Sequence, residues 1–320
     1  MIKYSYKYEL GGNFMKRKDF ILALMVVIVW GANFTVIKLG LDGVPSMLLV
    51  AMRYFFVAFP AVFFIKRPNI HWKYVLYYGF TVGVAQFGCL FYAMEIGMSA
   101  GLASIIVQLQ AFLSPFLGSI FLKEKLKPKQ LIGFFIAAIG LTFIGIASTS
   151  NGISAIPVGA LLLTLGAPTF WSISNIIARY ASDLAKENGD KLDMLSLVVW
   201  SGLVPPIPMI GLALLIDSPD VLINSIVNLR FISLFSALYI GLLATLFGYG
   251  YWNILLSKYP LAKISPLSLL VPITGLFTAR IVLSESLSGM QWIGAFIILA
   301  GLIIANIDFK QLLNKSTEPN

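Results

Sequence analysis

Charged residues, cysteine and histidine are all scarce in this 320-residue sequence. Charged side chains make up 12% of it, whereas a soluble domain carries about 25%, so the chain has too little polar surface to fold in water. The single cysteine, Cys89, excludes an internal disulfide, and the single histidine, His71, lacks the cysteine partners of a typical zinc site. Neither a phosphate-binding P-loop nor an HExxH pattern is present. We therefore expect no metal and no cofactor.

Hydrophobic residues are abundant instead, at 58% of the chain with a mean hydropathy of +0.88. A helix needs about 20 apolar residues to cross the hydrocarbon core of a bilayer, and ten runs of that length are predicted. They cover residues 20–40, 46–65, 74–95, 99–122, 130–148, 157–180, 194–216, 230–256, 261–283 and 289–307. The seventh run contains Pro205-Pro206-Ile207-Pro208, which predicts a broken span.

The net charge of +9 is distributed over short loops, as in a membrane protein that obeys the positive-inside rule, and does not indicate a nucleic-acid partner. Lys and Arg gather before the first span, in alternate loops and after the last span. The remaining loops hold Asp42, Asp217, Asp220 and Glu285, with Arg230 as their only basic residue. This asymmetry predicts that both termini are cytoplasmic.

The second half of the chain repeats motifs of the first. Leu122-Lys123-Glu124, Gln130, Gly133 and Gly140 recur 161 residues later as Leu283-Ser284-Glu285, Gln291, Gly294 and Gly301. Trp30 and Lys38 recur 141 residues later as Trp171 and Arg179. Since five spans per repeat is an odd number, the two halves must be inverted in the membrane, with a substrate site near the midplane between them.

The sequence therefore predicts an all-α integral membrane protein with ten transmembrane helices in two inverted five-helix repeats. We expect an N-terminal extension over residues 1–15, with Met15 as a candidate start, and a first repeat over 16–148. A second repeat follows over 149–310 and a cytoplasmic tail over 311–320. Ten helices can enclose a pathway within one chain, so a monomer suffices, and a homo-oligomer is the alternative.

Several motifs resemble those of the EamA family in the drug/metabolite transporter superfamily, over roughly residues 16–310. The residues that carry the resemblance are Trp30-Gly31-Ala32-Asn33-Phe34, Lys38, Arg53, Gly101-Leu102-Ala103-Ser104, Glu124-Lys125-Leu126, Ser265-Pro266-Leu267-Ser268 and Glu285-Ser286-Leu287. Further runs resemble the members that export O-acetylserine and cysteine, namely Ala85-Gln86-Phe87 and Gly248-Tyr249-Gly250-Tyr251-Trp252. The resemblance implies efflux of small amino-acid-like metabolites through a bacterial inner membrane. One departure is Pro168 before Trp171, which we expect to bend the helix that lines the cavity.

Arg53 is the deepest charge that the predicted spans contain. A charge at the bilayer centre costs about 2.5–3.5 kcal/mol on insertion scales, so Arg53 is the first candidate for binding a substrate carboxylate, which a guanidinium can contact with two hydrogen bonds. The alternative is a structural role, in which Arg53 pairs with Glu95 or caps backbone carbonyls and so holds helices together. Lys38, Glu95 and Arg280 lie near the ends of spans and are predicted to act in gating or charge pairing.

Neutral polar and aromatic residues on the spans complete the predicted substrate site. They are Asn33, Gln86, Tyr92, Gln108, Trp171, Asn175, Tyr249, Trp252 and Ser268. Polar side chains in a membrane face other helices or a wet cavity, and for each residue an interhelical hydrogen bond is the competing interpretation.

The sequence favours a solute exporter that works by alternating access, with the lipid bilayer and a small-molecule substrate as its partners. One alternative is an exporter of another solute, such as an aromatic amino acid, a toxic analogue or a nucleotide precursor, which a deep aromatic cavity would favour. The other is a membrane enzyme acting on a lipid-linked substrate. That enzyme would need a pair of titratable groups inside the bundle, and the spans show none.

Overall fold

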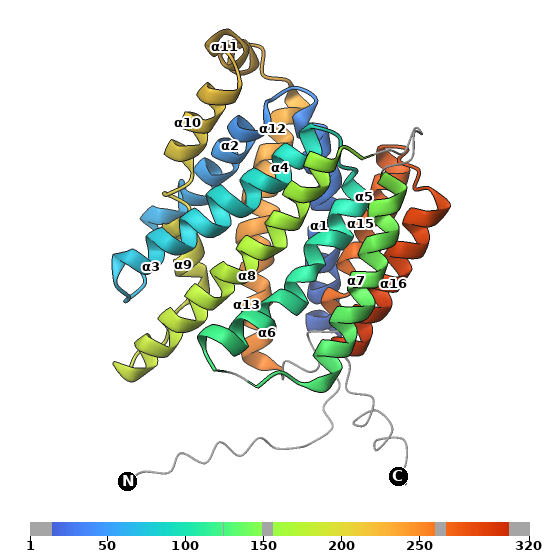
Figure 1. Cartoon of the computed structure of the whole chain (residues 1–320). Helices are drawn as coiled ribbons and strands as arrows, with labels where there is room; N and C mark the ends of the chain where they lie inside the picture. Colours follow the sequence, from blue (N-terminus) through green and yellow to red (C-terminus); the bar gives the residue numbers. More distant parts are fainter. Residues whose placement is uncertain (1–14, 124, 149–155, 260–266, 307–320) are drawn as a thin grey trace, which may run out of the picture.

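The computed structural model describes residues 15–123, 125–148, 156–259 and 267–306, and over these ranges the chain forms helices and connecting turns without a strand (Figure 1). The predicted tail, the predicted extension apart from Met15, and the motif residues Glu124, Ser265 and Pro266 lie outside the described residues.

The helices of the first repeat group into five segments, which run back and forth through the molecule (Figure 1). They are α1 (Arg17–Leu41); α2 (Ser46–Ala58) with η1 (Ala61–Phe63); α3 (Trp72–Tyr78) continued by η2 (Gly79–Gln86) and α4 (Phe87–Glu95); α5 (Ala100–Ile106) continued by η3 (Val107–Leu109) and α6 (Gln110–Phe121); and α7 (Pro128–Ser148).

The second repeat follows the same plan with one addition. Its segments are α8 (Val158–Glu187); α9 (Met194–Ser201) with α10 (Pro206–Ile216); α12 (Phe231–Leu238) continued by η4 (Tyr239–Phe247) and α13 (Gly248–Lys258); α15 (Val271–Val282); and α16 (Gly289–Asn306). The addition is α11 (Pro219–Val227), a short helix in the loop after α10. Pro168 sits inside α8, which stays one continuous helix.

Within the described ranges, seven helical segments are long and apolar enough to cross a membrane, and an eighth candidate is the broken pair α9 and α10. That pair bends by 42° where Pro205 and Pro206 leave two positions without a backbone donor, so the predicted break is confirmed. The shorter apolar helices α15 and α16 occupy the places of the last two predicted spans. The count of ten stays a prediction.

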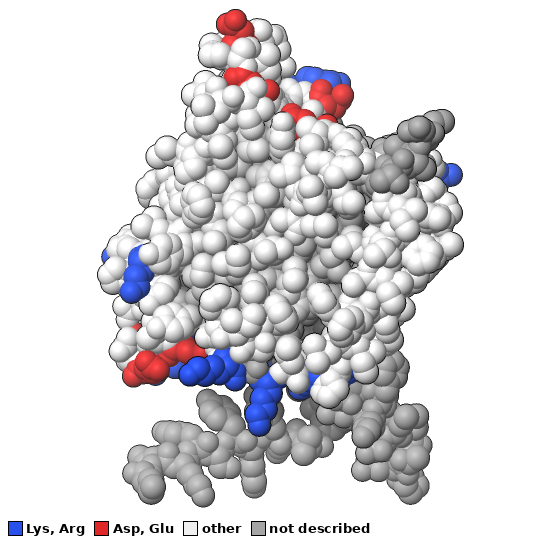
Figure 2. Space-filling view, viewed as in Figure 1, with Lys and Arg blue, Asp and Glu red and all other residues white. Residues whose placement is uncertain are grey.

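Most charged side chains on the face shown in Figure 2 gather at the two ends of the molecule, and the broad band between them is uncharged except for a basic group at its left edge. We call the end that carries α11 the upper end and the opposite end, where α1 begins and α16 ends, the lower end (Figure 1). A helix satisfies its own backbone polar groups, as a segment in lipid must. The many large hydrophobic side chains exposed on the surface of this chain are also suited to a lipid environment.

The repeat symmetry is visible in the local geometry. Lys123 and Ser284, 161 residues apart, both have a positive φ of 55°. Gln130 accepts a hydrogen bond from the backbone N–H three residues before it at 2.9 Å, and so does Gln291. Equivalent positions therefore turn and cap their helices in the same way.

The packing of α7 against α16, which cross in antiparallel directions, shows the same symmetry. A Cβ added to Gly133 would lie 2.5 Å from the Gly301 carbonyl, and one added to Gly140 would lie 2.6 Å from the Gly294 carbonyl. Because Gly133 corresponds to Gly294 and Gly140 to Gly301, the two contacts are related by an approximate two-fold axis. Helix α1 runs from the lower to the upper end and α8 runs back (Figure 1), as inverted repeats require.

The glycine crossing yields a paired stability test within α7. Gly140→Ala places a methyl group against backbone and should lower the free energy of unfolding by about 1–3 kcal/mol. Gly145→Ala meets nothing within 4 Å and should raise it by about 0.5–1 kcal/mol, since alanine favours helix. Thermal unfolding of the detergent-solubilised protein measures both; equal shifts for the two variants would contradict the close crossing.

Candidate functional site

Arg53 lies between the two repeats, with 3% of its surface exposed. It is carried by α2, and its Nη2 donates to the Thr245 hydroxyl of η4 at 3.1 Å. Its guanidinium carbon lies 3.6 Å from the centroid of the Phe87 ring, at the start of α4, and 5.4 Å from that of Tyr54. The cation is thus held by an aromatic face from the first repeat and a hydroxyl from the second.

Two π-helical segments flank this arginine. Segment η2 ends at Gln86, next to Phe87, and η4 contains Thr245, so corresponding segments of the two repeats meet at one cation. The Thr245 hydroxyl also donates to the Ile240 carbonyl five residues earlier, at 2.9 Å. π-Helical turns are rare and occur frequently at functional sites.

Buried polar atoms without a partner concentrate on three predicted site residues. Within the described part of the chain they are Asn33 Oδ1, Arg53 Nε and Nη1, Gln86 Oε1 and, outside the predicted set, Ser236 Oγ. Asn33 and Gln86 are 8% and 2% exposed. Leaving a buried donor or acceptor unpaired costs about 1–3 kcal/mol, so these atoms are unused hydrogen-bond donors and acceptors inside the bundle.

The alternative pair between Arg53 and Glu95 is wrong. The Glu95 carboxylate accepts from the Ser46 backbone N–H at 3.1 Å and from its hydroxyl at 2.6 Å. It therefore caps the first turn of α2, while Arg53 lies two turns further along the same helix.

An aromatic group adjoins the arginine. The Trp30 ring lies 5.7 Å from Tyr249 and 5.1 Å from Trp252, and its Nε1 donates to the Ala244 carbonyl at 2.8 Å. Gly248 permits this approach, because an added Cβ would lie 2.4 Å from the Trp30 nitrogen. Ala244 directly precedes Thr245, the partner of Arg53, which connects the aromatic group to the charged site.

A separate cluster of polar side chains, which includes Asn175, links α6 to α8 by hydrogen bonds. The Asn175 amide donates to the Ser114 hydroxyl at 3.0 Å and to Gln110 Oε1 at 3.4 Å, and Ser114 donates to the Ser172 hydroxyl at 3.2 Å. Gln110 and Ser114 were not among the predicted site residues, although their i, i+4 spacing on one helix face was a signal that could have found them.

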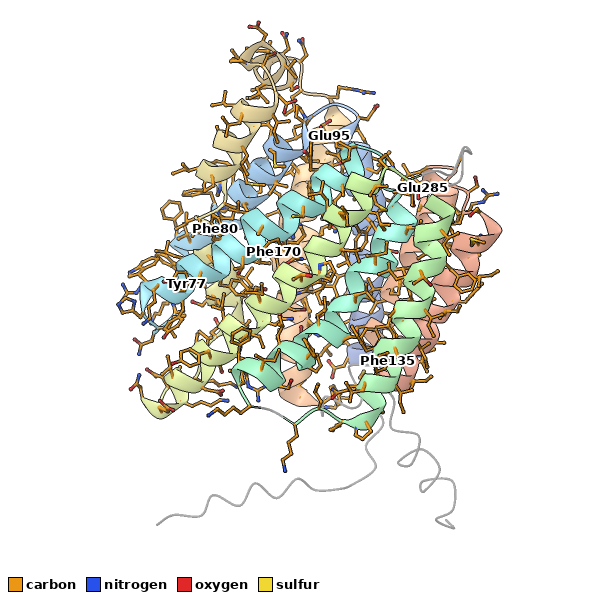
Figure 3. The ribbon with its side chains drawn as sticks, viewed as in Figure 1. Tyr77, Phe80, Glu95, Phe135, Phe170 and Glu285 are labelled. Carbon is orange, nitrogen blue, oxygen red and sulfur yellow. The ribbon has the colours of Figure 1, made fainter. Side chains whose placement is uncertain are left out.

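At the upper end lies what we call the upper clasp, formed by Lys38, Glu95 and Glu285 (Glu95 and Glu285 in Figure 3). The Lys38 ammonium donates to the carbonyls of Met94 at 2.5 Å and Met98 at 3.4 Å. It also interacts electrostatically with both carboxylates. The gating or pairing role of Lys38 and Glu95 stays a prediction, and Glu285 was not among the predicted site residues.

Glu285 ties the second repeat to the first. Its carboxylate accepts from the backbone N–H groups of Ala100 at 2.8 Å and Gly101 at 3.0 Å, at the start of α5. Arg280 donates to the Glu285 carbonyl at 3.2 Å. These residues border a cavity of about 260 Å³ at the upper end. The capping partners are 185 and 184 positions apart in sequence, which is why no local pattern predicted them.

At the lower end, contacts of Asp19 that we call the lower tie join α1 to the end of α13. The Asp19 carboxylate accepts from Lys258 at 3.2 Å and from the Tyr259 hydroxyl at 2.7 Å.

Among the other predicted site residues, Tyr92 and Trp171 pack against the core, and Gln108 in η3 is half-buried. Ser268 lies just before α15. The described contacts do not bring Asn175 or Gln108 to Arg53.

Two inverted helical repeats with a buried, incompletely paired polar site at their interface define the architecture of a membrane transporter. Residues 18–146 and 158–307 each match the EamA-like transporter family. The chain belongs to this family, and it is a transporter rather than an enzyme.

Named relatives cover nearly the whole chain. A probable amino-acid metabolite efflux pump of Salmonella typhimurium is 42% identical over 92% of this chain and 97% of its own length. A protein of the same description from Escherichia coli is 41% identical over 91% and 95%. A probable terminal-alkyne amino-acid exporter of Streptantibioticus cattleyicolor is 23% identical over 91% and 95%. One solved crystal structure shares the fold, with a TM-score of 0.59 at 15% identity over 90% of this chain and 98% of that one.

The upper clasp can be tested with a buried reporter. Thr35 is 3% exposed and lies one turn below Lys38; in a Cys89→Ser background, Thr35→Cys should react slowly with a membrane-impermeant maleimide. Adding Glu285→Gln should speed labelling roughly tenfold, because hydrogen bonds to a charged group contribute about 1.5–3 kcal/mol. Lys186→Gln, in an exposed intrahelical pair with Asp183, is the control. Unchanged labelling in Glu285→Gln would show that the clasp does not hold the upper end closed.

Proposed function

We propose that this chain exports small amino-acid-like metabolites, of the O-acetylserine and cysteine type, across a bacterial inner membrane by alternating access between its two repeats. Both termini lie in the cytoplasm in this proposal, so the lower end faces inward and the upper clasp faces outward. The charge asymmetry of the loops supports the orientation, and the names of the bacterial relatives support the substrate class.

The observation that carries the proposal is the state of Arg53. Its guanidinium is buried between the repeats, keeps Nε and Nη1 unpaired, and bonds only a neutral hydroxyl among the described residues. A carboxylate bound there would replace the missing counter-charge with charge-assisted hydrogen bonds, which are the strong ones in proteins. Asn33 and Gln86 offer unpaired oxygens that suit an ammonium donor. An amino acid supplies both groups.

An aromatic amino acid is the second candidate substrate, and the group of Trp30, Tyr249 and Trp252 favours it. Tilted aromatic contacts between these rings could be extended by a ring on the solute, since aromatic pairs contribute about 0.5–1.5 kcal/mol beyond their burial. Competition by phenylalanine against a cysteine substrate distinguishes the two candidates.

The test measures uptake of labelled O-acetylserine and cysteine into inverted membrane vesicles. Arg53→Gln should lower uptake at least tenfold, since losing one partner of a buried charge contact costs about 2–5 kcal/mol. Arg179→Gln removes an arginine that is exposed and paired within its own helix and should transport normally. Cysteine methyl ester, which lacks the carboxylate, should not compete.

Two results would contradict parts of this proposal. Absence of uptake of either solute, in vesicles that hold folded wild-type protein, removes the substrate class. Saturable uptake that survives in folded Arg53→Gln removes the carboxylate contact but leaves the exporter function.

A further inference from the structure

An apolar groove crosses the boundary between the two repeats on the outer surface of the bundle. Its volume is about 590 Å³. Its lining residues are Leu76, Tyr77, Phe80 and Thr81 from the first repeat and Ile177 and Val204 from the second. Tyr77 and Phe80 project at the edge of the molecule (Figure 3) and are 56% and 54% exposed.

The surface that lines the groove is apolar. The Thr81 hydroxyl donates to the Tyr77 carbonyl at 2.7 Å, so its hydrogen is used within the helix. The groove also begins within a helical segment long and apolar enough to span a membrane, Trp72–Glu95. Its surroundings are therefore hydrocarbon, and its occupant must be apolar where it touches the protein.

Basic residues lie just beyond the lower end of this groove. Lys66, Arg67 and Lys73 are exposed where α3 begins, and Figure 2 shows Lys and Arg side chains at the left edge over that part of the molecule. The Arg67 guanidinium carbon lies 5.5 Å from the Trp72 ring and the Lys73 ammonium 5.0 Å from the Tyr74 ring. Trp and Tyr at this level are typical of the membrane interface.

Two nearby carboxylates, those of Asp190 and Asp193, accept hydrogen bonds from groups other than these basic side chains. Asp190 accepts a hydrogen bond from the Asn69 amide. Asp193 caps the start of α9 by accepting from the backbone N–H groups of Leu195 and Ser196. These donors are neutral, so both carboxylates keep their charge, but Lys66, Arg67 and Lys73 outnumber them and the cluster keeps a net positive charge.

We propose that an anionic phospholipid binds here, with one acyl chain in the groove between the repeats and its phosphate beside Arg67 and Lys73. Lys73 precedes Phe80 by seven residues, a rise of roughly 10 Å along a helix, which matches the step from a headgroup to the upper part of its acyl chain. Basic residues beside membrane helices attract anionic lipid. This site is separate from Arg53 and does not depend on the identity of the exported solute.

The test compares lipid retention by the purified full-length chain in native mass spectrometry. Phosphatidylglycerol and phosphatidylcholine with identical acyl chains are the probes. We expect the wild type to retain phosphatidylglycerol preferentially. The double variant Arg67→Gln/Lys73→Gln should reduce that preference roughly tenfold to thirtyfold, given the attraction of each cation near the surface. Lys125→Gln/Lys127→Gln removes two exposed basic residues away from the groove and should leave it unchanged.

Groove-filling variants test the acyl-chain half of the proposal. Thr81→Trp fills the groove from the first repeat and Ile177→Trp from the second, and each should lower retention of both lipids. Circular dichroism and thermal unfolding identify the variants that fold. The proposal is overturned if the folded double variant keeps the wild-type preference, or if the folded groove-filling variants retain lipid as the wild type does.

Discussion

The burial of one permanent charge constrains the centre of this protein. Arg53 is almost inaccessible, and a charge at that depth costs about 2.5–3.5 kcal/mol on insertion scales. The chain offsets the cost with the Phe87 ring and the Thr245 hydroxyl, which come from opposite repeats. Any movement of one repeat against the other must therefore change the surroundings of the guanidinium. This couples the charged site to the conformation of the whole bundle.

The duplicated architecture is symmetric in its scaffold and asymmetric in its site. Helices α7 and α16 cross through equivalent glycines, and Lys123 and Ser284 adopt the same backbone conformation. The buried cation has no counterpart in the second repeat, because α9 and α10 contain no basic residue to match Arg53 in α2. A symmetric scaffold can present equivalent closing contacts at its two ends, whereas a single cation gives one binding site at the interface.

The sequence was sufficient for the features that depend on composition and local pattern. Apolar run lengths predicted the helical membrane fold, the proline cluster predicted the break between α9 and α10, and depth within a span singled out Arg53. The missed features depend on long-range contacts or on a hydrogen-bond register. Glu285 caps a helix that begins 185 positions earlier, and the π-helical register of η2 and η4 leaves no distinct hydrophobic period. The family relationship adds the transporter class but no residue roles.

The placement of the carboxylates bears on how transport is driven. Asp19 lies in the lower tie, and Glu95 and Glu285 lie in the upper clasp, each bonded to named partners at an end of the bundle. None of these three contacts Arg53, so in the described structure the protein does not neutralise its own central cation with them. On the proposed function, the carboxylate of the solute does so. Occupied and empty carriers then differ by one buried counter-charge, and this difference gives the bound solute an electrostatic means of favouring the movement of the repeats.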